Sequence, residues 1–93
     1  MKIEHIAGKK KGKIMLYALS TCVWCKKTKQ LLDELGVEYS YIFMDTLDEK
    51  ERETIIKELS KWNPRRSFPT MVINDTDCIV GFKEDEIKSK VSP

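Results

Sequence analysis

The sequence predicts an α/β fold in which a four-stranded mixed sheet is flanked by three helices, and three observations lead to this prediction. Apolar runs of strand length alternate with segments whose apolar residues recur at helical spacing, in the order β-α-β-α-β-β-α. Strands separated by helices must pair in parallel, because each pair is joined by a crossover. The last two strands follow each other closely enough to form an antiparallel hairpin.

The first half of the chain supplies two strands and one helix. Residues 14–19 form an almost continuous apolar run, which is typical of a strand that is buried on both faces. Ser20 and Thr21 follow as candidate N-caps of a helix that ends at Gly36. The positions of this helix that recur at helical spacing are Trp24, Thr28, Leu31, Leu32 and Leu35. Residues 38–44 are rich in aromatic and β-branched side chains and are predicted to form the second strand.

The second helix is predicted to start after three side chains with capping chemistry and to run to about residue 60. These side chains are Asp45, Thr46 and Asp48. Pro64 prevents the helix from continuing and biases the residue before it away from helical geometry.

The end of the chain is predicted to form a hairpin and a third helix. Residues 70–73 and 78–80 are the two strands of the hairpin, and Asn74 and Asp75 form a turn after the first of them. Residues 84–91 form a charged helix.

Length and composition limit the domain organisation and the partners. Residues 1–93 are expected to form one domain, with residues 1–12 as an N-terminal extension in which residues 3–7 are a candidate edge strand. Hydrophobic residues, at 41%, suffice for one modest core. Charged residues make up 34% but nearly cancel to +2, which argues against a nucleic-acid partner. We expect a monomer without nucleic-acid or membrane partners.

The cellular compartment is predicted from the N-terminus and the apolar runs. The basic N-terminal segment lacks the apolar region of a secretory signal, and no apolar run reaches the length of a membrane span. We therefore expect a cytoplasmic protein, in a compartment where thiols are kept reduced.

The chemistry is predicted to centre on Cys22 and Cys25, which stand where the first strand gives way to the first helix. Residues three apart on a helix share a face, so the two sulfurs can reach bonding distance. The helix N-terminus and the following Lys26 and Lys27 favour a thiolate. Cys22 is nearer the helix tip and is predicted to be the exposed nucleophile. Cys25 lies one turn further in and is predicted to be the buried resolving thiol.

Two other uses of these cysteines are weighed against redox exchange. A structural disulfide is a poor alternative, because closing a four-residue loop stabilises the fold by only about 2 kcal/mol. Zinc or an iron–sulfur cluster is the stronger alternative, because Cys78 and His5 could complete a set of three cysteines and one histidine. Otherwise Cys78, in an apolar strand, is expected to be a small buried hydrophobic residue. The strand-then-helix position of the pair favours redox chemistry, and no metal site is predicted.

Pro69 stands at the start of the third predicted strand, beside the strand that leads to Cys22. It can be read simply as a residue that starts a strand, where its missing N–H does no harm. A cis peptide bond between Phe68 and Pro69 would instead hold the backbone of Phe68 beside the sulfurs, free to pair with an extended substrate. Both readings stay open at this point.

Together these features resemble the glutaredoxin family of the thioredoxin superfamily, and most closely the glutaredoxin-like redoxins associated with ribonucleotide reductase. The resemblance covers residues 13–91 and rests on three segments in the right order: residues 14–25, residues 67–70 and residues 80–85. It implies a thioredoxin-like fold and dithiol–disulfide exchange through Cys22 and Cys25 in an electron carrier without a bound cofactor.

The resemblance also implies the residues of the site. Cys22 would be the nucleophile, Cys25 the resolving thiol and Pro69 a cis proline. The segment that contains Gly81 would lie beside the thiols and bind substrate. The predicted substrate-binding residues are Thr21, Val23, Trp24, Phe68, Pro69, Gly81, Phe82 and Lys83.

Three departures from the glutathione-dependent members bear on the reductant. Val23 and Trp24 stand where those members have proline and tyrosine, residues 18–21 lack their lysine, and Val80 replaces the first glycine of a pair. The external reductant is therefore expected to be a protein disulfide reductase, such as a thioredoxin reductase or a ferredoxin-linked reductase, in preference to glutathione. The clients implied are proteins with disulfides, ribonucleotide reductase among them.

Overall fold

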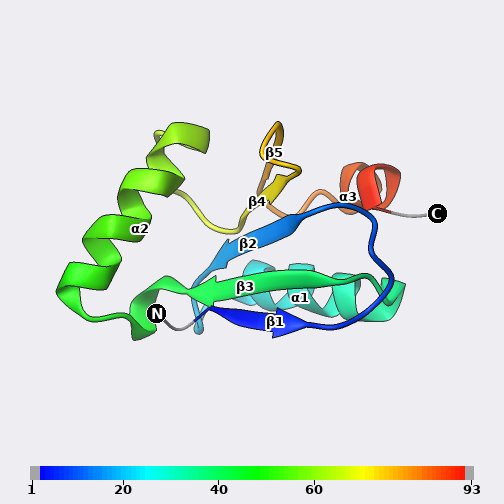
Figure 1. Cartoon of the computed structure of the whole chain (residues 1–93), viewed down its shortest axis with the longest axis horizontal. Helices are drawn as coiled ribbons and strands as arrows, with labels where there is room; N and C mark the ends of the chain where they lie inside the picture. Colours follow the sequence, from blue (N-terminus) through cyan, green and yellow to red (C-terminus); the bar gives the residue numbers. More distant parts are fainter. Residues whose placement is uncertain (1–2, 92–93) are drawn as a thin grey trace.

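A five-stranded mixed sheet forms the centre of the molecule, in the spatial order β1-β3-β2-β4-β5 (Figure 1). The computed structural model describes residues 3–91 of the chain. The strands are β1 (Glu4–Ile6), β2 (Ile14–Ala18), β3 (Tyr39–Phe43), β4 (Thr70–Ile73) and β5 (Asp77–Val80). β2 and β3 pair in parallel, whereas β1 with β3, β2 with β4, and β4 with β5 pair antiparallel.

The helices cover both faces of the sheet (Figure 1). They are α1 (Val23–Leu35), α2 (Glu49–Trp62), α3 (Glu84–Val91) and the short 3-10 helix η1 (Met44–Thr46). Buried residues of α1 and α3 join one hydrophobic cluster, and buried residues of α2 join the other. The three-layer arrangement confirms the predicted thioredoxin-like α/β fold.

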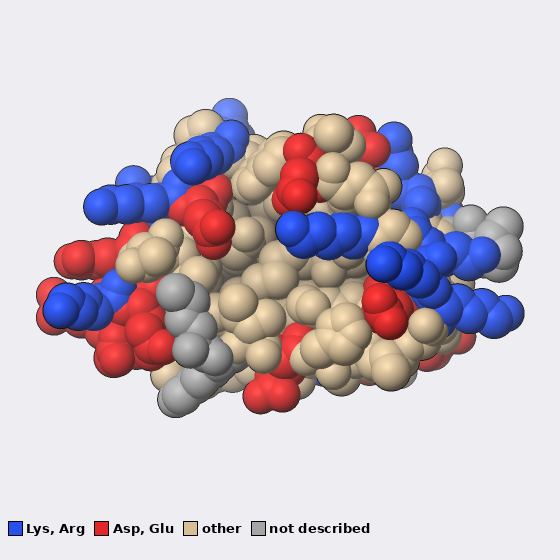
Figure 2. Space-filling model, viewed as in Figure 1, with Lys and Arg blue, Asp and Glu red and all other residues tan. Residues whose placement is uncertain are grey.

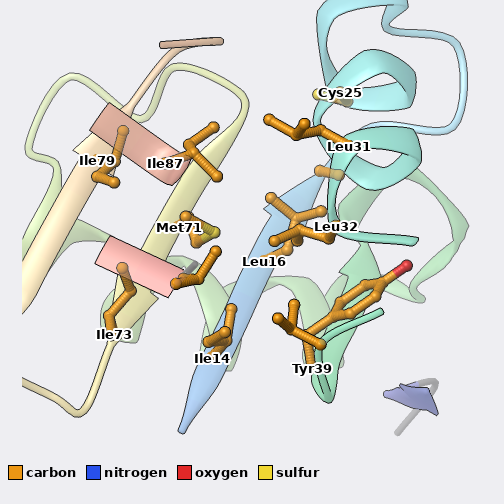
Figure 3. Packing of buried hydrophobic residues seen from close by; sticks show 13 residues of the cluster. Ile14, Leu16, Cys25, Leu31, Leu32, Tyr39, Met71, Ile73, Ile79 and Ile87 are labelled. Atoms are coloured by element: carbon orange, nitrogen blue, oxygen red, sulfur yellow. The ribbon is translucent and has the colours of Figure 1, made fainter. Parts of the chain in front are cut away.

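β2 packs against both layers, because alternate residues of a strand point to opposite faces. Ile14, Leu16 and Ala18 belong to the cluster with α1 and α3, while Tyr17 belongs to the cluster with α2. The run is therefore buried on both faces, as its continuous hydrophobicity predicts. Figure 3 shows Cys25 at the end of the first cluster, next to Leu31 of α1. The core thus fixes the start of α1 against the sheet.

The sheet has five strands and not the four that the sequence predicts. The additional strand is β1, in which Glu4 pairs with Tyr41 and Ile6 with Tyr39. This pairing confirms the candidate edge strand at residues 3–7, although only Glu4–Ile6 join the ladder.

The N-cap of α1 differs from the prediction, whereas the N-cap of α2 is one of the three predicted candidates. The N-cap of α1 is Cys22, and not Ser20 or Thr21, because the Ser20 backbone N–H and hydroxyl both donate to the Asp45 carboxylate. With Asp45 engaged there, the N-cap of α2 is Asp48, which accepts from the Glu51 N–H in a capping box. The C-terminal end of α1 is the predicted Gly36, in the left-handed conformation with φ 69°.

The surface agrees with the near-neutral charge of the chain. Figure 2 shows lysine and arginine interspersed with aspartate and glutamate around an uncharged centre on the face viewed.

A pocket of about 300 Å³ lies on the α2 side of the sheet, lined in part by Met15, Tyr17 and Val72, and neither Cys22 nor Cys25 lines it. Within residues 3–91, no helix has the length and apolar character needed to cross a bilayer.

The cap of α2 gives a stability prediction. Replacing Asp48 by alanine removes the acceptor of the Glu51 N–H and should lower the free energy of unfolding by about 1 kcal/mol. Urea denaturation measures this change. Asp48→Ser keeps an acceptor at the N-cap and should retain most of the stability. An equal loss in both variants would contradict the capping role.

Candidate active site

The two cysteines stand at the start of α1, Cys22 at the N-cap and Cys25 within the first turn. Cys22 is half-buried at the N-cap, and its sulfur accepts a hydrogen bond from the Cys25 backbone N–H at 3.3 Å. Cys25 is only 1% exposed. Both thiols are free in this structure. Cys25 is thus the more buried of the two, as the sequence predicts, while Cys22 is half-buried and not fully exposed.

Cys22 stands where α1 presents hydrogen-bond donors. The first turn of a helix carries backbone N–H groups without helical partners, and the helix dipole adds partial positive charge there. The Cys25 N–H points at the Cys22 sulfur from this turn. The sulfur of Cys22 thereby takes the place of a capping oxygen at the N-cap.

Cys25 has the opposite environment. Burial first, and then the neighbouring Cys22 and Asp45, raise the pKa of its thiol to about 12, although the Leu19 backbone opposes the shift. Cys25 is therefore a neutral thiol in the reduced protein at physiological pH. It can hold its proton until Cys22 has reacted.

A groove of about 230 Å³ lies close to the cysteines and is built from three segments of the chain. Its walls are Trp24 of α1, Phe68 and Pro69 before β4, and Gly81 and Phe82 after β5. The Trp24 and Phe82 rings are stacked with centroids 6.0 Å apart. The Trp24 side chain is nevertheless 55% exposed, so the groove offers aromatic surface to a partner.

Backbone contacts connect two of these segments. The Phe68–Pro69 peptide bond is cis, as the resemblance implies. The Pro69 carbonyl accepts a hydrogen bond from the Gly81 N–H at 2.8 Å. Gly81 has φ 86°, a conformation that favours glycine. The turn after β5 is thereby held against the loop before β4.

The groove gathers five of the eight residues predicted to bind substrate. Thr21, Val23 and Lys83 are exposed but do not line it. Val23, at 62% exposed, adds to the apolar surface around Cys22. A cation also lies against the aromatic wall, because the Lys27 Nζ is 4.8 Å from the centre of the Trp24 ring.

The sequence did not reveal the contact between Ser20 and Asp45. The Ser20 N–H donates to one carboxylate oxygen of Asp45 at 2.9 Å, and the Ser20 hydroxyl donates to the other. These hydrogen bonds hold the pKa of the Asp45 carboxyl below its usual range. They tie the turn before Cys22 to η1. Both side chains read locally as helix caps, and only the parallel pairing of β2 and β3 brings them together.

The structure does not favour the metal-binding alternative. His5 lies on β1 and Cys78 on β5, which are the opposite edges of the sheet. Within residues 3–91, no three histidine, cysteine or acidic side chains are placed to share a metal ion.

Cys78 is half-buried, so the expectation of a buried residue is wrong. Cys78 lies on β5, an edge strand, so a neighbouring strand covers only one side of it.

Comparison with known proteins identifies the family. The family model for glutaredoxin matches residues 14–78. The chain belongs to the glutaredoxin family. Its structure resembles the glutaredoxin of Methanosarcina mazei Go1, with a TM-score of 0.89 and 50% identity over 96% of this chain and 86% of that chain. It also resembles methanoredoxin of Methanosarcina acetivorans, with a TM-score of 0.88 and 54% identity. That match covers 90% of this chain and 88% of methanoredoxin.

A curated relative of similar size agrees with this assignment. It is described as an uncharacterized glutaredoxin-like 8.6 kDa protein in the rubredoxin operon of Clostridium pasteurianum. It is 38% identical over 74 residues, which cover 80% of this chain and 91% of the relative. The family and the fold together make this glutaredoxin a thiol–disulfide oxidoreductase with a Cys22–Cys25 pair, and its family acts without a bound cofactor.

The burial of Cys25 gives a prediction for its reactivity. In a Cys22→Ser, Cys78→Ser variant, Cys25 should react with iodoacetamide at pH 8 at least about 100-fold more slowly than in denaturant. Because burial, the largest cause of the raised Cys25 pKa, remains in this variant, the rate should keep rising with pH through about pH 10 without a plateau. Mass spectrometry of quenched samples measures the rate. A plateau near pH 9 would contradict the neutral buried thiol.

The charge of Asp45 gives a second prediction. Asp45→Asn removes the charge but keeps an acceptor for the Ser20 N–H. Since Asp45 raises the Cys25 pKa, this variant should speed the alkylation of Cys25, by less than about tenfold because the charge is the smallest of the causes. Ser20→Ala is the matched control, which weakens the contact and keeps the charge. A larger effect of Ser20→Ala would show that the contact, and not the charge, controls Cys25.

Proposed function

We propose that this glutaredoxin reduces disulfide bonds of proteins by dithiol exchange, with Cys22 as nucleophile and Cys25 as resolving thiol. The observation that carries the proposal is the contrast between the two sulfurs. Cys22 is accessible at the N-cap, where a backbone N–H points at its sulfur, and Cys25 is buried directly behind it. This contrast supports the proposed order, in which Cys22 reacts first and Cys25 second.

In the first step the Cys22 thiolate attacks one sulfur of the client disulfide. A bond forms between the Cys22 sulfur and that client sulfur while the client's own S–S bond breaks. The other client sulfur leaves as a thiolate and takes up a proton. The product is a mixed disulfide between Cys22 and the client.

In the second step Cys25 attacks the Cys22 sulfur of the mixed disulfide. The Cys22–Cys25 bond forms, the bond to the client breaks, and the proton of Cys25 passes to the departing client sulfur. Two electrons have then moved from the protein dithiol to the client. The 3.3 Å contact between the Cys25 N–H and the Cys22 sulfur supports this step, since the resolving residue already adjoins its target.

The surface around Cys22 supports a protein as substrate. Trp24, Phe68 and Phe82 line the groove, and the exposed Val23 side chain adjoins Cys22 in the sequence. Exposed aromatic and aliphatic side chains that gather around a reactive group are typical of protein–protein contact. A client chain can pair with the backbone of Phe68 in extended form while its disulfide meets Cys22.

The reductant that restores the dithiol is proposed to be a protein disulfide reductase. Its support is the resemblance noted in the sequence, which implies that Val23, Trp24 and Val80 stand where glutathione-dependent members of the family have other residues. We place the reaction in the cytoplasm, where other thiols are also kept reduced.

A reductase-coupled assay tests the proposal. It follows the reduction of a protein disulfide with thioredoxin reductase, with a ferredoxin-linked reductase, or with glutathione and glutathione reductase. Turnover should be highest with a protein reductase and fall to background in Cys22→Ser. Cys25→Ser should accumulate a mixed disulfide with the client on a non-reducing gel, because the resolving thiol is missing. Turnover that survives Cys22→Ser would refute the proposal.

A further inference from the structure

A second pocket adjoins the aromatic groove on the other side of Phe68. It has a volume of about 320 Å³, and Phe68 lines both cavities. The second pocket is lined by Leu19, Met44, Asp45, Arg52, Ile56 and Phe68. Four of these six side chains are apolar, and they come from the loop after β2, η1, α2 and the loop before β4.

Both charged residues of this pocket are engaged within the protein. The Asp45 carboxylate accepts from the Ser20 N–H and the Ser20 hydroxyl. The Arg52 guanidinium donates from Nε to the Met44 carbonyl at 3.4 Å and from Nη2 to the Leu47 carbonyl at 3.1 Å. A charged group of a ligand would lose its hydration on entering the pocket, and it could pair with Asp45 or Arg52 only by displacing these hydrogen bonds. The surface that the pocket offers is therefore apolar.

The pocket lies close to the nucleophile. The Leu19 carbonyl, at its edge, accepts a hydrogen bond from the Cys22 N–H at 3.2 Å. Because Phe68 forms the common wall, a chain that crosses the groove to reach Cys22 has this pocket beside it. Side chains on either side of the target cysteine are thus within reach of the pocket.

We infer that this pocket binds an apolar side chain of the client close in sequence to the cysteine that Cys22 attacks. The inference rests on the proposed dithiol exchange and narrows its substrate class to proteins whose reducible cysteine is flanked by an aliphatic or aromatic residue. Burial of one such side chain contributes favourable contact area in the complex, where a charged residue would lose hydration without a partner.

Peptide mixed disulfides test this inference. Each short peptide carries one cysteine joined to 5-thio-2-nitrobenzoate, whose release is followed by absorbance when Cys22 attacks the peptide sulfur. Leucine, lysine or glutamate is placed in turn at each of the two positions before and after the cysteine, and glycine peptides serve as the reference. With the wild-type protein, leucine in at least one position should raise kcat/KM by about tenfold over glycine, mainly through KM. Lysine and glutamate should give no such gain.

Variants of α2 locate the effect. Ile56→Lys puts a cation into the pocket, so the preference for leucine should disappear and glutamate should become the preferred residue. Thr54→Lys adds the same charge at an exposed position of the same helix and should leave the preferences unchanged. Ile56→Ala removes apolar surface without adding charge and should weaken the leucine preference severalfold. Reaction with the glycine peptide should persist in all three variants, which shows that they are folded and that Cys22 reacts.

The outcomes separate this inference from the proposed exchange. Equal rates for leucine and glycine peptides in the wild-type protein would overturn the inference while leaving the exchange intact. The same change in Thr54→Lys as in Ile56→Lys would also overturn it, because charge alone would then explain the preference. Failure of the wild-type protein to react with every peptide would refute the exchange and the inference together.

Discussion

The site depends on one hydrogen bond, in which the Cys25 N–H donates to the Cys22 sulfur at the start of α1. This bond caps the helix, and it also holds the nucleophile in the positive field of the helix end. The residue that supplies the N–H carries the second thiol, which packs into the core beside Leu31. Two chemically identical side chains therefore differ in burial because one lies a helical turn further in. Cys22 is half-buried, whereas Cys25 is enclosed in the core, where burial raises the pKa of its thiol.

The surroundings of the pair come from segments that are distant in the sequence and meet where β2 ends and β4 begins. β2 leads directly to Cys22, and its neighbour β4 begins directly after Pro69. The Gly81 N–H bonds to the Pro69 carbonyl, and the Phe82 ring stacks on Trp24. The central pairing of β2 with β3 and β4 therefore positions the groove, while the contacts at its rim only join neighbouring loops.

The sequence predicted what depends on local pattern and missed what depends on contacts between distant residues. Periodicity and turn residues gave the order of the elements, and the Cys22–Cys25 spacing gave the pair. Ser20 was predicted as a cap because its hydroxyl suits that position. In the structure that hydroxyl instead donates to the carboxylate of Asp45, which lies 25 residues away in the sequence. The apolar pocket likewise arises from packing between segments that carry no shared local signal. Thr21 and Lys83 adjoin Cys22 and Phe82 in the sequence, but both are exposed and neither lines the groove.

The apolar character of the surface next to Cys22 limits how selective the protein can be. A hydrophobic pocket distinguishes side chains that differ by one methylene group by about 1–3 kcal/mol, or roughly 10- to 200-fold in rate. Asp45 and Arg52 are engaged within the protein, so they cannot add the stronger discrimination that free charges give. Under the proposed exchange, such a surface favours clients with an apolar residue beside the reducible cysteine and ranks them by the fit of that residue. It suits a carrier that reduces several proteins more than an enzyme built for one.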